Sequence, residues 1–398
     1  MKKLKTMSIL LLSGIVLSAC GDPTGNEPAN GENGQAENAQ TTANVINQNQ
    51  LGGGYYAPVL TEEGGYKTSN NRGITLNLNS GINISLFEKD LMRLSQEHFS
   101  TDDYLIQEGQ YLTREMATSW LGRTTTESTE DLSNDEIEKR ELLNGLNPAQ
   151  SPEFNPSEGV YNHDARVPSY LQSILEFDFY QESGSSTPSG LSIGLAMNTV
   201  DYYIDNEYRQ WSQNISPEQA LEQGQAMANE IVRRIRQIEE IKNIPIFIGI
   251  YEQAARDDLA GGIYVATGTS TDGSTAVQDW TKINEERIIF PLEGRDSSEG
   301  NAFANFQSEI EDFFPDLSGI TGQAHYINDR METLTINIMT QFFGKTEMIA
   351  FTQYLKQSAT TYLPADLDVE IVVESPKNIE AFLKKDRTDS EYLAHVFN

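Results

Sequence analysis

The chain has 398 residues, of which 38% are hydrophobic and 9% aromatic, enough for one large or two ordinary globular domains. Its formal net charge is −31, which argues against binding to nucleic acid or to anionic lipid headgroups. Cys20 is the only cysteine, so the sequence excludes an intramolecular disulfide.

The first nineteen residues have the pattern of an export signal. Lys2, Lys3 and Lys5 form a positive head, and an apolar run from Met7 to Ala19 follows. A bilayer span needs roughly twenty apolar residues. The run is shorter than that, so we interpret residues 1–19 as a signal peptide and not as a permanent membrane helix.

The tetrad Leu17-Ser18-Ala19-Cys20 resembles the bacterial lipobox. In proteins with this motif, the cysteine thiol receives a diacylglyceryl group and the signal is cut just before it. The alternative is an ordinary thiol beside a conventional cleavage site. We expect a lipidated Cys20 that anchors the mature protein to the outer face of the cytoplasmic membrane. No cofactor is expected beyond this acyl lipid.

Residues 20–52 form the next predicted segment, a flexible tether. From Gly21 to Gln50 the chain consists mostly of Gly, Asn, Gln, Thr, Glu and Pro. Such a composition cannot bury enough apolar surface to offset the entropy of ordering. We expect the tether to lift the globular part off the membrane.

An N-terminal α+β subdomain is predicted for residues 53–160. Its expected elements are a short strand at Ile74–Leu78 and helices at Ser85–Phe99 and Met116–Leu121. The charged stretch Thr124–Glu141 is predicted to be an exposed loop or a solvated helix. A turn-rich segment containing three Xaa-Pro pairs, 147–156, then indicates the boundary near residue 160.

A C-terminal α+β domain is predicted for residues 161–398. Leu175, Phe177 and Phe179 alternate with acidic residues, which indicates a strand with one buried face. A second strand at Leu191–Val200 would complete a hairpin. A capping box at Ser216 starts a long helix that the apolar spacing extends to Ile241. Further strands are expected at 244–251 and 262–267.

The same order of elements recurs near the C-terminus. Strands at Thr321–Tyr326 and Leu334–Met339 are followed by a helix from a Thr346 cap to Tyr362, and by a strand at Leu367–Val373. Hairpin, helix and strand therefore occur twice. The predicted fold class is α+β, with antiparallel sheets, packed helices and two related hairpin-helix-strand units.

One motif allows a catalytic alternative. Gly190-Leu191-Ser192-Ile193-Gly194 matches the G-x-S-x-G nucleophile pattern, with His325 and His395 downstream as possible bases. That motif needs a strand, a sharp turn and a helix, whereas the strand pattern here continues beyond Ser192. We therefore predict no enzyme and no metal site, and keep a membrane-tethered hydrolase of an envelope substrate as the alternative.

Several segments resemble the CamS family of Gram-positive sex-pheromone lipoproteins, in the same order along the chain. They are the lipobox, Tyr104–Leu112, Gly145–Pro148, Tyr170–Leu175, Asp178–Tyr180, Gly194–Asn198 and Ile244–Tyr251. The resemblance covers nearly all of the mature chain. It implies a lipid-anchored protein of the Gram-positive cell envelope.

The resemblance also implies that a hydrophobic peptide is cut from the end of the signal sequence. The matching residues are Ser13, Gly14, Ile15, Val16, Leu17, Ser18 and Ala19. This fragment is either a pheromone for a peptide receptor or an ordinary degradation product. We expect the globular body to be a binding or interaction module, with a ligand-capturing lipoprotein that serves a transporter as a further alternative.

Overall fold

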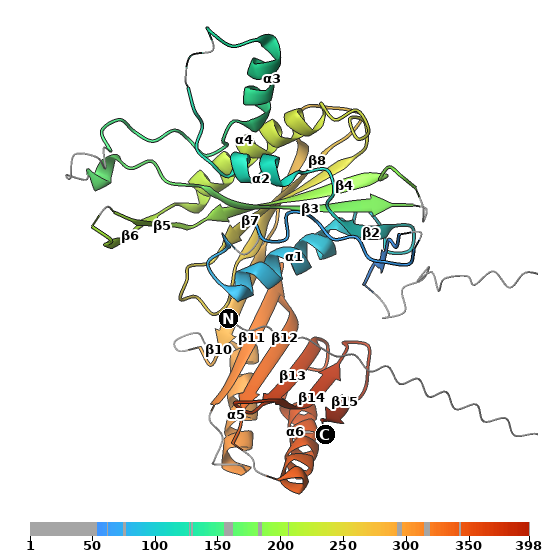
Figure 1. Ribbon diagram of the computed structural model, residues 1–398. Helices are drawn as coiled ribbons and strands as arrows, with labels where there is room; N and C mark the ends of the chain where they lie inside the picture. The colour runs from blue at the N-terminus through green and yellow to red at the C-terminus, as the bar shows by residue number, and fades with distance from the viewer. Residues whose placement is uncertain are drawn as a thin grey trace, which may run out of the picture. The chain divides into compact units, whose positions relative to one another are not determined.

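The computed structural model describes residues 54–397, apart from 62, 75, 76, 127, 129, 155–161, 182–184, 206, 293–296, 314–318, 342 and 343 (Figure 1). The chain divides into two compact units, residues 1–42 and 43–398, and every described residue belongs to the second. The predicted signal peptide and tether therefore lie outside the described residues.

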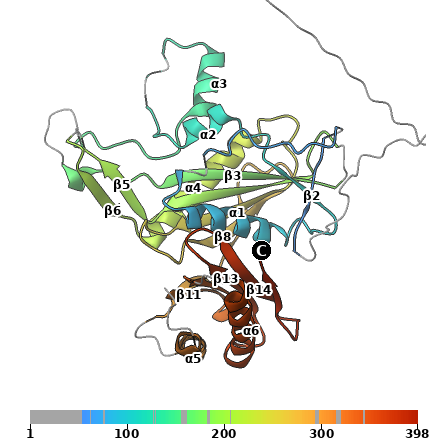
Figure 2. The same cartoon turned by 60° about the horizontal axis from the view of Figure 1, so that its bottom comes forward.

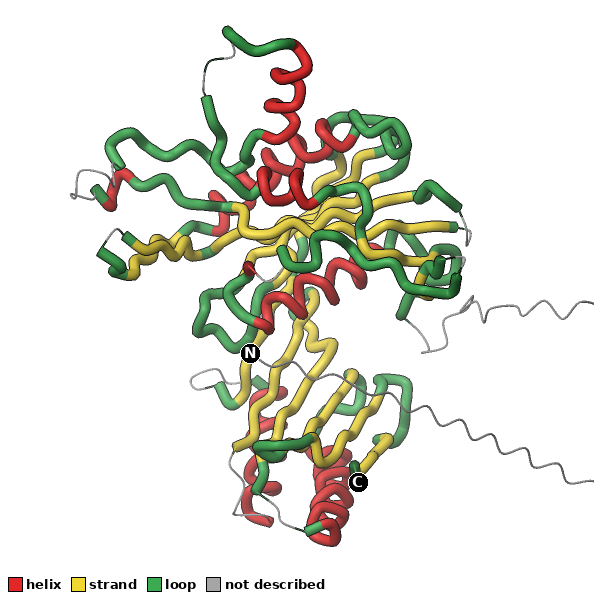
Figure 3. The backbone as a smooth tube through the Cα atoms, in the orientation of Figure 1, coloured by secondary structure: helices red, strands yellow, loops and turns green. Residues whose placement is uncertain are grey.

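Helices and strands both contribute substantially to the described part (Figure 3). The α-helices are α1 (Gly81–Ser95), α2 (Arg114–Trp120), α3 (Asn134–Leu143), α4 (Pro217–Ile235), α5 (Ser298–Phe313) and α6 (Lys345–Tyr362). The strands of the first half are β1 (Ala57–Pro58), β2 (Leu105–Glu108), β3 (Leu171–Tyr180), β4 (Gly190–Asn198), β5 (Val200–Ile204), β6 (Gln210–Asn214), β7 (Ile246–Gln253), β8 (Ile263–Ser270) and β9 (Gln278–Lys282). The later strands are β10 (Glu285–Phe290), β11 (Gly319–Ile327), β12 (Arg330–Met339), β13 (Asp368–Glu374), β14 (Ile379–Lys385) and β15 (Leu393–Val396).

The larger sheet has seven strands in the order β1-β2-β3-β4-β7-β8-β9. Its central strands are buried on both faces. In β7, Ile246 and Ile248 pack in the cluster with α4, whereas Phe247 and Tyr251 pack in the cluster with α1. Successive side chains of a strand point to opposite faces. A near-continuous apolar sequence in β7 is therefore what two covering helices require.

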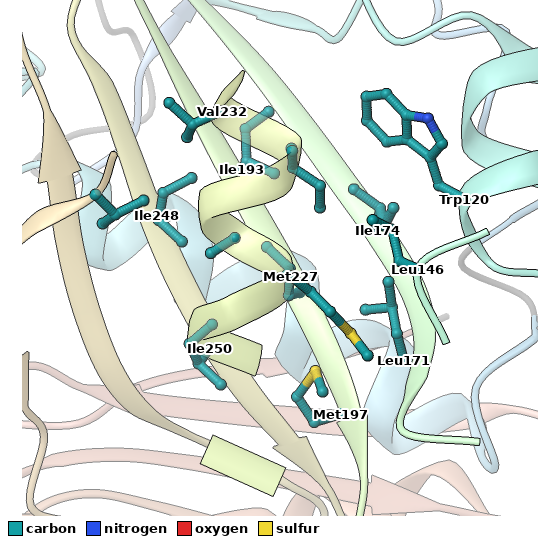
Figure 4. Close-up of a cluster of buried hydrophobic side chains, with 14 of the residues drawn as sticks. Trp120, Leu146, Leu171, Ile174, Ile193, Met197, Met227, Val232, Ile248 and Ile250 are labelled. Atoms are coloured by element: carbon teal, nitrogen blue, oxygen red, sulfur yellow. The ribbon is translucent and has the colours of Figure 1, made fainter. Parts of the chain in front are cut away.

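Helix α4 begins as the sequence predicts. Ser216 Oγ accepts a hydrogen bond from the backbone N–H of Gln219 at 3.2 Å, and the Gln219 side chain accepts one from Ser216 N–H at 3.2 Å. This capping box satisfies two N–H groups that the helix cannot pair internally. Figure 4 shows Met227 and Val232 of α4 in a buried cluster with Ile193 of β4.

The predicted end of this helix at Ile241 is wrong, because α4 ends at Ile235. The chain then turns, and Ile241 is still fully buried. The Arg236 guanidinium fixes the turn by donating to the carbonyl oxygens of Ile244 at 2.7 Å and Ser270 at 3.0 Å. The apolar spacing therefore marked core positions correctly in a segment that is no longer helical.

The second sheet has six strands in the order β10-β11-β12-β13-β14-β15. Helices α5 and α6 cover one face of it (Figure 2). Alternate residues of its central strands, such as Leu334 and Ile336 in β12, are buried in one cluster with Phe303 of α5 and Phe351 of α6. The alternation of apolar and polar residues in these strands reflects a sheet with one buried face.

The two sheets share one strand topology, which confirms the predicted recurrence of hairpin, helix and strand. In the larger sheet the order is β3, β4, α4, β7, and in the second it is β11, β12, α6, β13. An antiparallel strand, β2 or β10, precedes each hairpin, and another, β8 or β14, follows each unit.

The predicted antiparallel pairs are present, but both large sheets are mixed because each also contains a parallel pair. Each hairpin is antiparallel, but β4 pairs with β7 in parallel and β12 pairs with β13 in parallel. In each unit a helix lies between the two parallel strands. A helical crossover returns the chain to the end of the sheet where the previous strand began, so the next strand runs in the same direction.

Two local predictions are also wrong. Of the strand predicted at 74–78, Ile74 lies in a turn, Asn77 in a 3-10 turn and Leu78 in a bend, while residues 75 and 76 lie outside the described residues. Ile74 and Leu78 are both buried, so their alternation reflects core contacts without strand pairing. Thr346 does not cap α6; the cap position is Gly344, which has no side chain to form a capping bond.

The charged segment Thr124–Glu141 is a loop up to Ser133 where it is described and continues as helix α3, none of whose residues is buried, so both predicted alternatives apply to part of it. Ser133 caps it with a capping box to Glu136. The division of the body at residue 160 stays a prediction, and β2 before that point pairs with β3 after it.

Candidate functional site

A cavity of about 570 Å³ lies between α1, β2, β3 and the segment 66–73. Most of its wall is apolar, with Ile84 and Met92 from α1, Ile106 from β2, Phe177 from β3 and Leu112 from the chain after β2. Its volume falls within the range of roughly 300–1,000 Å³ that is typical of small-ligand pockets.

Glu108 organises the polar edge of the cavity. Its carboxylate accepts hydrogen bonds from Ser69 N–H at 2.8 Å, from Arg72 Nε at 2.7 Å and from the Tyr66 hydroxyl at 3.3 Å. Burial acts to raise the pKa of Glu108, but the hydrogen bonds from Arg72 and Ser69 outweigh it, so the pKa lies below its usual value. Burial and the nearby Glu108 charge raise the pKa of Tyr66 to about 12.

Asn71 lies on the wall of the same cavity with one polar atom unsatisfied. Its Nδ2 donates to the carbonyl oxygen of Leu112, which fixes the orientation of the amide. Its Oδ1 is buried and receives no hydrogen bond from any residue that the structure describes. Buried acceptors normally have a donor, so this atom is an exception among the described residues.

Two buried acids of β3, Glu176 and Asp178, correct the sequence analysis, which placed them on the solvent face of the strand. Glu176 is 5% exposed and Asp178 is fully buried. The Glu176 carboxylate accepts hydrogen bonds from Tyr111 N–H at 3.1 Å and Leu112 N–H at 2.9 Å, and Asp178 accepts one from Gln110 N–H at 3.0 Å. Backbone N–H groups of the segment after β2 thus replace water around both acids.

Burial raises the pKa of both groups, that of Glu176 to about 7 and that of Asp178 well above its usual value. The repulsion between the two carboxylates raises the Asp178 pKa further. Asp178 Oδ1 finds no donor in the described part of the chain. Because the pKa of both acids is raised, the pair favours holding a proton near neutral pH, and a proton between the two carboxylates would give Asp178 Oδ1 a donor.

The nucleophile pattern around Ser192 does not form a nucleophile elbow. All five residues lie in β4, and Ser192 is fully buried. Its hydroxyl is 2.7 Å from the Ser95 hydroxyl of α1. Of the candidate bases, His325 is 2.8 Å from Glu285, and His395 lies in β15 of the other sheet. The serine therefore bonds a neighbouring helix and has no exposed Oγ.

Ser192→Ala tests this assignment. We expect neither the wild type nor the variant to be labelled by a fluorophosphonate probe, because the wild-type hydroxyl is shielded from reagent. Labelling of the wild type that disappears in Ser192→Ala would contradict the structural role and restore the hydrolase alternative. Intact protein mass after probe treatment gives the readout.

A buried network of charged side chains joins α1 to β10 and β11. Asp90 accepts a hydrogen bond from Arg287 Nη2 at 2.6 Å, and Glu285 accepts from Arg93 Nη2 at 2.7 Å and pairs with His325. Burial acts to raise the pKa of Asp90, but the charges of Arg287 and Arg93 outweigh it and hold the pKa below its usual value. This network crosslinks distant parts of the sequence.

Within the described ranges, the structure places no group of three or more His, Cys, Asp or Glu residues where they could hold a metal ion. Among these same residues, no helix combines the length and the apolar character needed to cross a membrane. The lipidation candidate Cys20 and the peptide segment 13–19 lie outside the described residues.

The fold and cavity define an α+β protein with a duplicated sheet topology and a ligand-sized pocket. Comparison with family models matches residues 66–391 to the family described as CamS sex pheromone cAM373 precursor. The match covers well over half of the chain, and the protein therefore belongs to the CamS family.

Solved structures support the assignment. A sex pheromone precursor from Lactobacillus salivarius subsp. salivarius UCC118 is 31% identical, with 86% of this chain and 96% of that chain covered and a TM-score of 0.75. The C-terminal domain of sex pheromone staph-cAM373 precursor from Staphylococcus aureus is 28% identical, with 81% and 98% covered and a TM-score of 0.68. A search of curated proteins found no match.

Proposed function

We propose that this CamS protein is a surface lipoprotein whose signal-peptide end is released as a peptide pheromone. Diacylglyceryl on Cys20 would anchor it to the outer face of the cytoplasmic membrane of a Gram-positive cell. The observation that carries the proposal is the tetrad Leu17-Ser18-Ala19-Cys20 at the end of an apolar run, in a chain of a family described as sex pheromone precursors.

The chemistry of the tetrad supports lipidation. Small residues at Ser18 and Ala19 fit a signal peptidase, and Cys20 supplies the thiol. Two acyl chains give stable membrane binding, whereas a single chain is marginal. The segment Ser13–Ala19 has no charged side chain, which suits a peptide that must reach a receptor in another cell.

Cys20→Ala is expected to abolish lipidation and to release the protein from the membrane fraction. The measurement is the mass of the N-terminal tryptic peptide from membranes, which should run from Cys20 to Lys67 and carry diacylglycerol in the wild type. A matched Ser18→Ala variant preserves a small residue and should be processed normally. The proposed lipid anchor would be refuted if the wild-type Cys20 carried no lipid. It would also be refuted if the Cys20→Ala variant were processed and still remained in the membrane fraction.

A separate experiment tests the proposed release of a peptide pheromone. Synthetic Ser-Gly-Ile-Val-Leu-Ser-Ala, added to recipient cells that respond to pheromone, should induce that response at nanomolar to micromolar concentration, the usual affinity range of specific ligands. A scrambled peptide of the same composition is the control. Equal responses to both peptides would refute a specific signal and leave an ordinary degradation product.

The body is proposed to be a binding module displayed by the anchor. The cavity beside β2 and β3 supports this role, because it combines an apolar wall with a small number of polar groups, the usual composition of a ligand pocket.

A further inference from the structure

We infer that the cavity between α1, β2 and β3 binds a single unbranched aliphatic chain of a lipid-like molecule. This names the ligand class for the binding role proposed above and rests on that part of the proposed function. It does not depend on lipidation of Cys20. The pairing of the polar groups, the apolar side chains and the length of the cavity all favour such a chain.

The polar side chains at the exposed side of the cavity are paired with one another. Tyr66 and Arg72 are both exposed, and both donate to the Glu108 carboxylate. Ser69 N–H is a further donor to the same carboxylate. A charged group of a ligand would have to replace these hydrogen bonds, so this side of the wall does not select for a charge.

The remaining polar side chains of the described wall also have partners. Glu176 accepts hydrogen bonds from two backbone N–H groups, and Glu88 has an interaction partner as well. Asn71 Nδ2 donates to the Leu112 carbonyl, and Asn71 Oδ1 has almost no accessible surface for a ligand to reach. Peptide groups or charges of a ligand would therefore leave water without gaining partners in this wall, which is unfavourable.

The apolar part of the wall is almost entirely aliphatic. Phe177 supplies one aromatic ring, and the other apolar side chains of the described wall are isoleucine, leucine and methionine. Met92 has an unbranched, flexible side chain, which adapts to the shape of a ligand. Such a wall binds methylene groups through the apolar surface that both sides remove from water.

The cavity extends along α1. Ile84, Glu88 and Met92 line it from one face of the helix, each four residues after the last. At a rise of 1.5 Å per residue, these positions span about 12 Å. The volume of about 570 Å³ is several times the roughly 150 Å³ of an apolar cavity that holds a benzene ring. Both dimensions favour an extended chain over a single ring.

Isothermal titration with straight-chain 1-alcohols tests the inference. The protein is the mature chain, residues 20–398, with Cys20→Ala, so that it carries no acyl chain of its own. We expect saturable 1:1 binding that strengthens about fourfold for each methylene group added between 1-hexanol and 1-decanol, because every buried methylene contributes a similar increment.

Two comparison probes test the selectivity for a chain. Cyclooctanol has the same number of carbon atoms as 1-octanol in a compact ring. The tripeptide amide Ile-Val-Leu has apolar side chains but also peptide groups and a charge. Both should bind at least about tenfold more weakly than 1-octanol.

Ile84→Trp places the binding in this cavity. The larger side chain should fill part of the space and weaken binding of 1-octanol by about tenfold or more. The matched control is Ile349→Trp at an exposed position of α6, which should bind as the parent protein does. Circular dichroism checks that both variants are folded. If Ile84→Trp does not fold, the comparison of 1-octanol with the two other probes in the parent protein is decisive.

Three results would overturn the inference: no saturable binding of the alcohols, equally tight binding of cyclooctanol or the tripeptide amide, or unchanged binding by folded Ile84→Trp. Saturable binding of the tripeptide amide without the alcohols would refute the aliphatic chain and leave the binding role of the body. The peptide mass at Cys20 tests the lipid anchor separately, so failure of the ligand class and failure of the anchor remain distinguishable.

Discussion

Replacing Arg287 by methionine is expected to lower the free energy of unfolding by about 3–5 kcal/mol, the usual cost of removing one partner of a buried ion pair. Arg287 donates to Asp90 at 2.6 Å, and their side chains are 6% and 2% exposed. Methionine fills most of the same volume but leaves the Asp90 carboxylate buried with only the longer contact to Arg93 at 3.3 Å. The loss is therefore mainly an uncompensated charge.

Urea unfolding at pH 7, followed by circular dichroism, measures the effect as a lower midpoint. Arg330→Met in β12 is the matched control, because Arg330 forms pairs that are largely exposed, and such pairs contribute about 0–1 kcal/mol. Asp90→Leu combined with Arg287→Met should recover part of the stability, since no buried charge then remains from this pair. Equal midpoints for Arg287→Met and Arg330→Met would contradict the prediction.

Lowering the pH should remove the stabilisation that the Asp90–Arg287 ion pair provides. The pKa of Asp90 in the folded protein lies below its ordinary value. Such a carboxylate contributes stability that is present above the unfolded pKa of about 4 and is lost as the pH falls through the folded value. The stability difference between the wild type and Arg287→Met should therefore shrink below about pH 4.

Local patterns were sufficient to predict five of the six described helices and the two hairpin-helix-strand units. The capping box at Ser216 and the alternation in β13 are encoded within a few residues, and both are as predicted. The parallel pairs were missed because pairing between β4 and β7 depends on where a helix returns the chain, which no local pattern records. The sequence analysis does not predict helix α5 or the strands β1, β2, β5, β6, β9, β10, β14 and β15.

The cavity was missed for a physical reason. Glu176 and Asp178 alternate with apolar residues, and that pattern ordinarily indicates a solvated face. Here the segment after β2 covers the acids with backbone N–H groups, and Gly109 permits the close approach: a Cβ there would lie 2.3 Å from Glu176 Oε2. The run Glu108-Gly109-Gln110 was noted only as a family segment, so its glycine was the signal that could have indicated a covered acid.

The buried acid pair is expected to make the protein less stable as the pH rises from about 4.5 to 7. The folded pKa of Glu176, about 7, lies above the unfolded value. A group of this kind contributes stability that is fully present below the unfolded pKa and is lost as the pH rises through the folded one. At 1.36 kcal/mol per pKa unit, the shift of Glu176 alone corresponds to a loss of about 3 kcal/mol in the free energy of unfolding over this pH range.

Asp178→Asn should remove much of this pH dependence and raise stability at pH 8 by about 1–3 kcal/mol, up to the amount that the acid pair costs. The asparagine amide can donate to the Glu176 carboxylate in place of the shared proton, and its oxygen can still accept from Gln110 N–H. The free-energy cost of ionising Glu176 in the folded protein would then be smaller. Urea midpoints of wild type and variant at pH 5, 6, 7 and 8 measure the effect.

Glu176→Gln separates this electrostatic effect from general repacking. A glutamine oxygen can accept from Tyr111 or Leu112 N–H, but its amide nitrogen would face the other N–H, so this variant should lose stability at every pH. Burial also raises the pKa of Glu252 to about 7, and that contribution cancels when the variants are compared with the wild type. If the midpoint difference between Asp178→Asn and wild type stays constant from pH 5 to 8, the acids share no proton, because only a proton-linked difference can vary with pH.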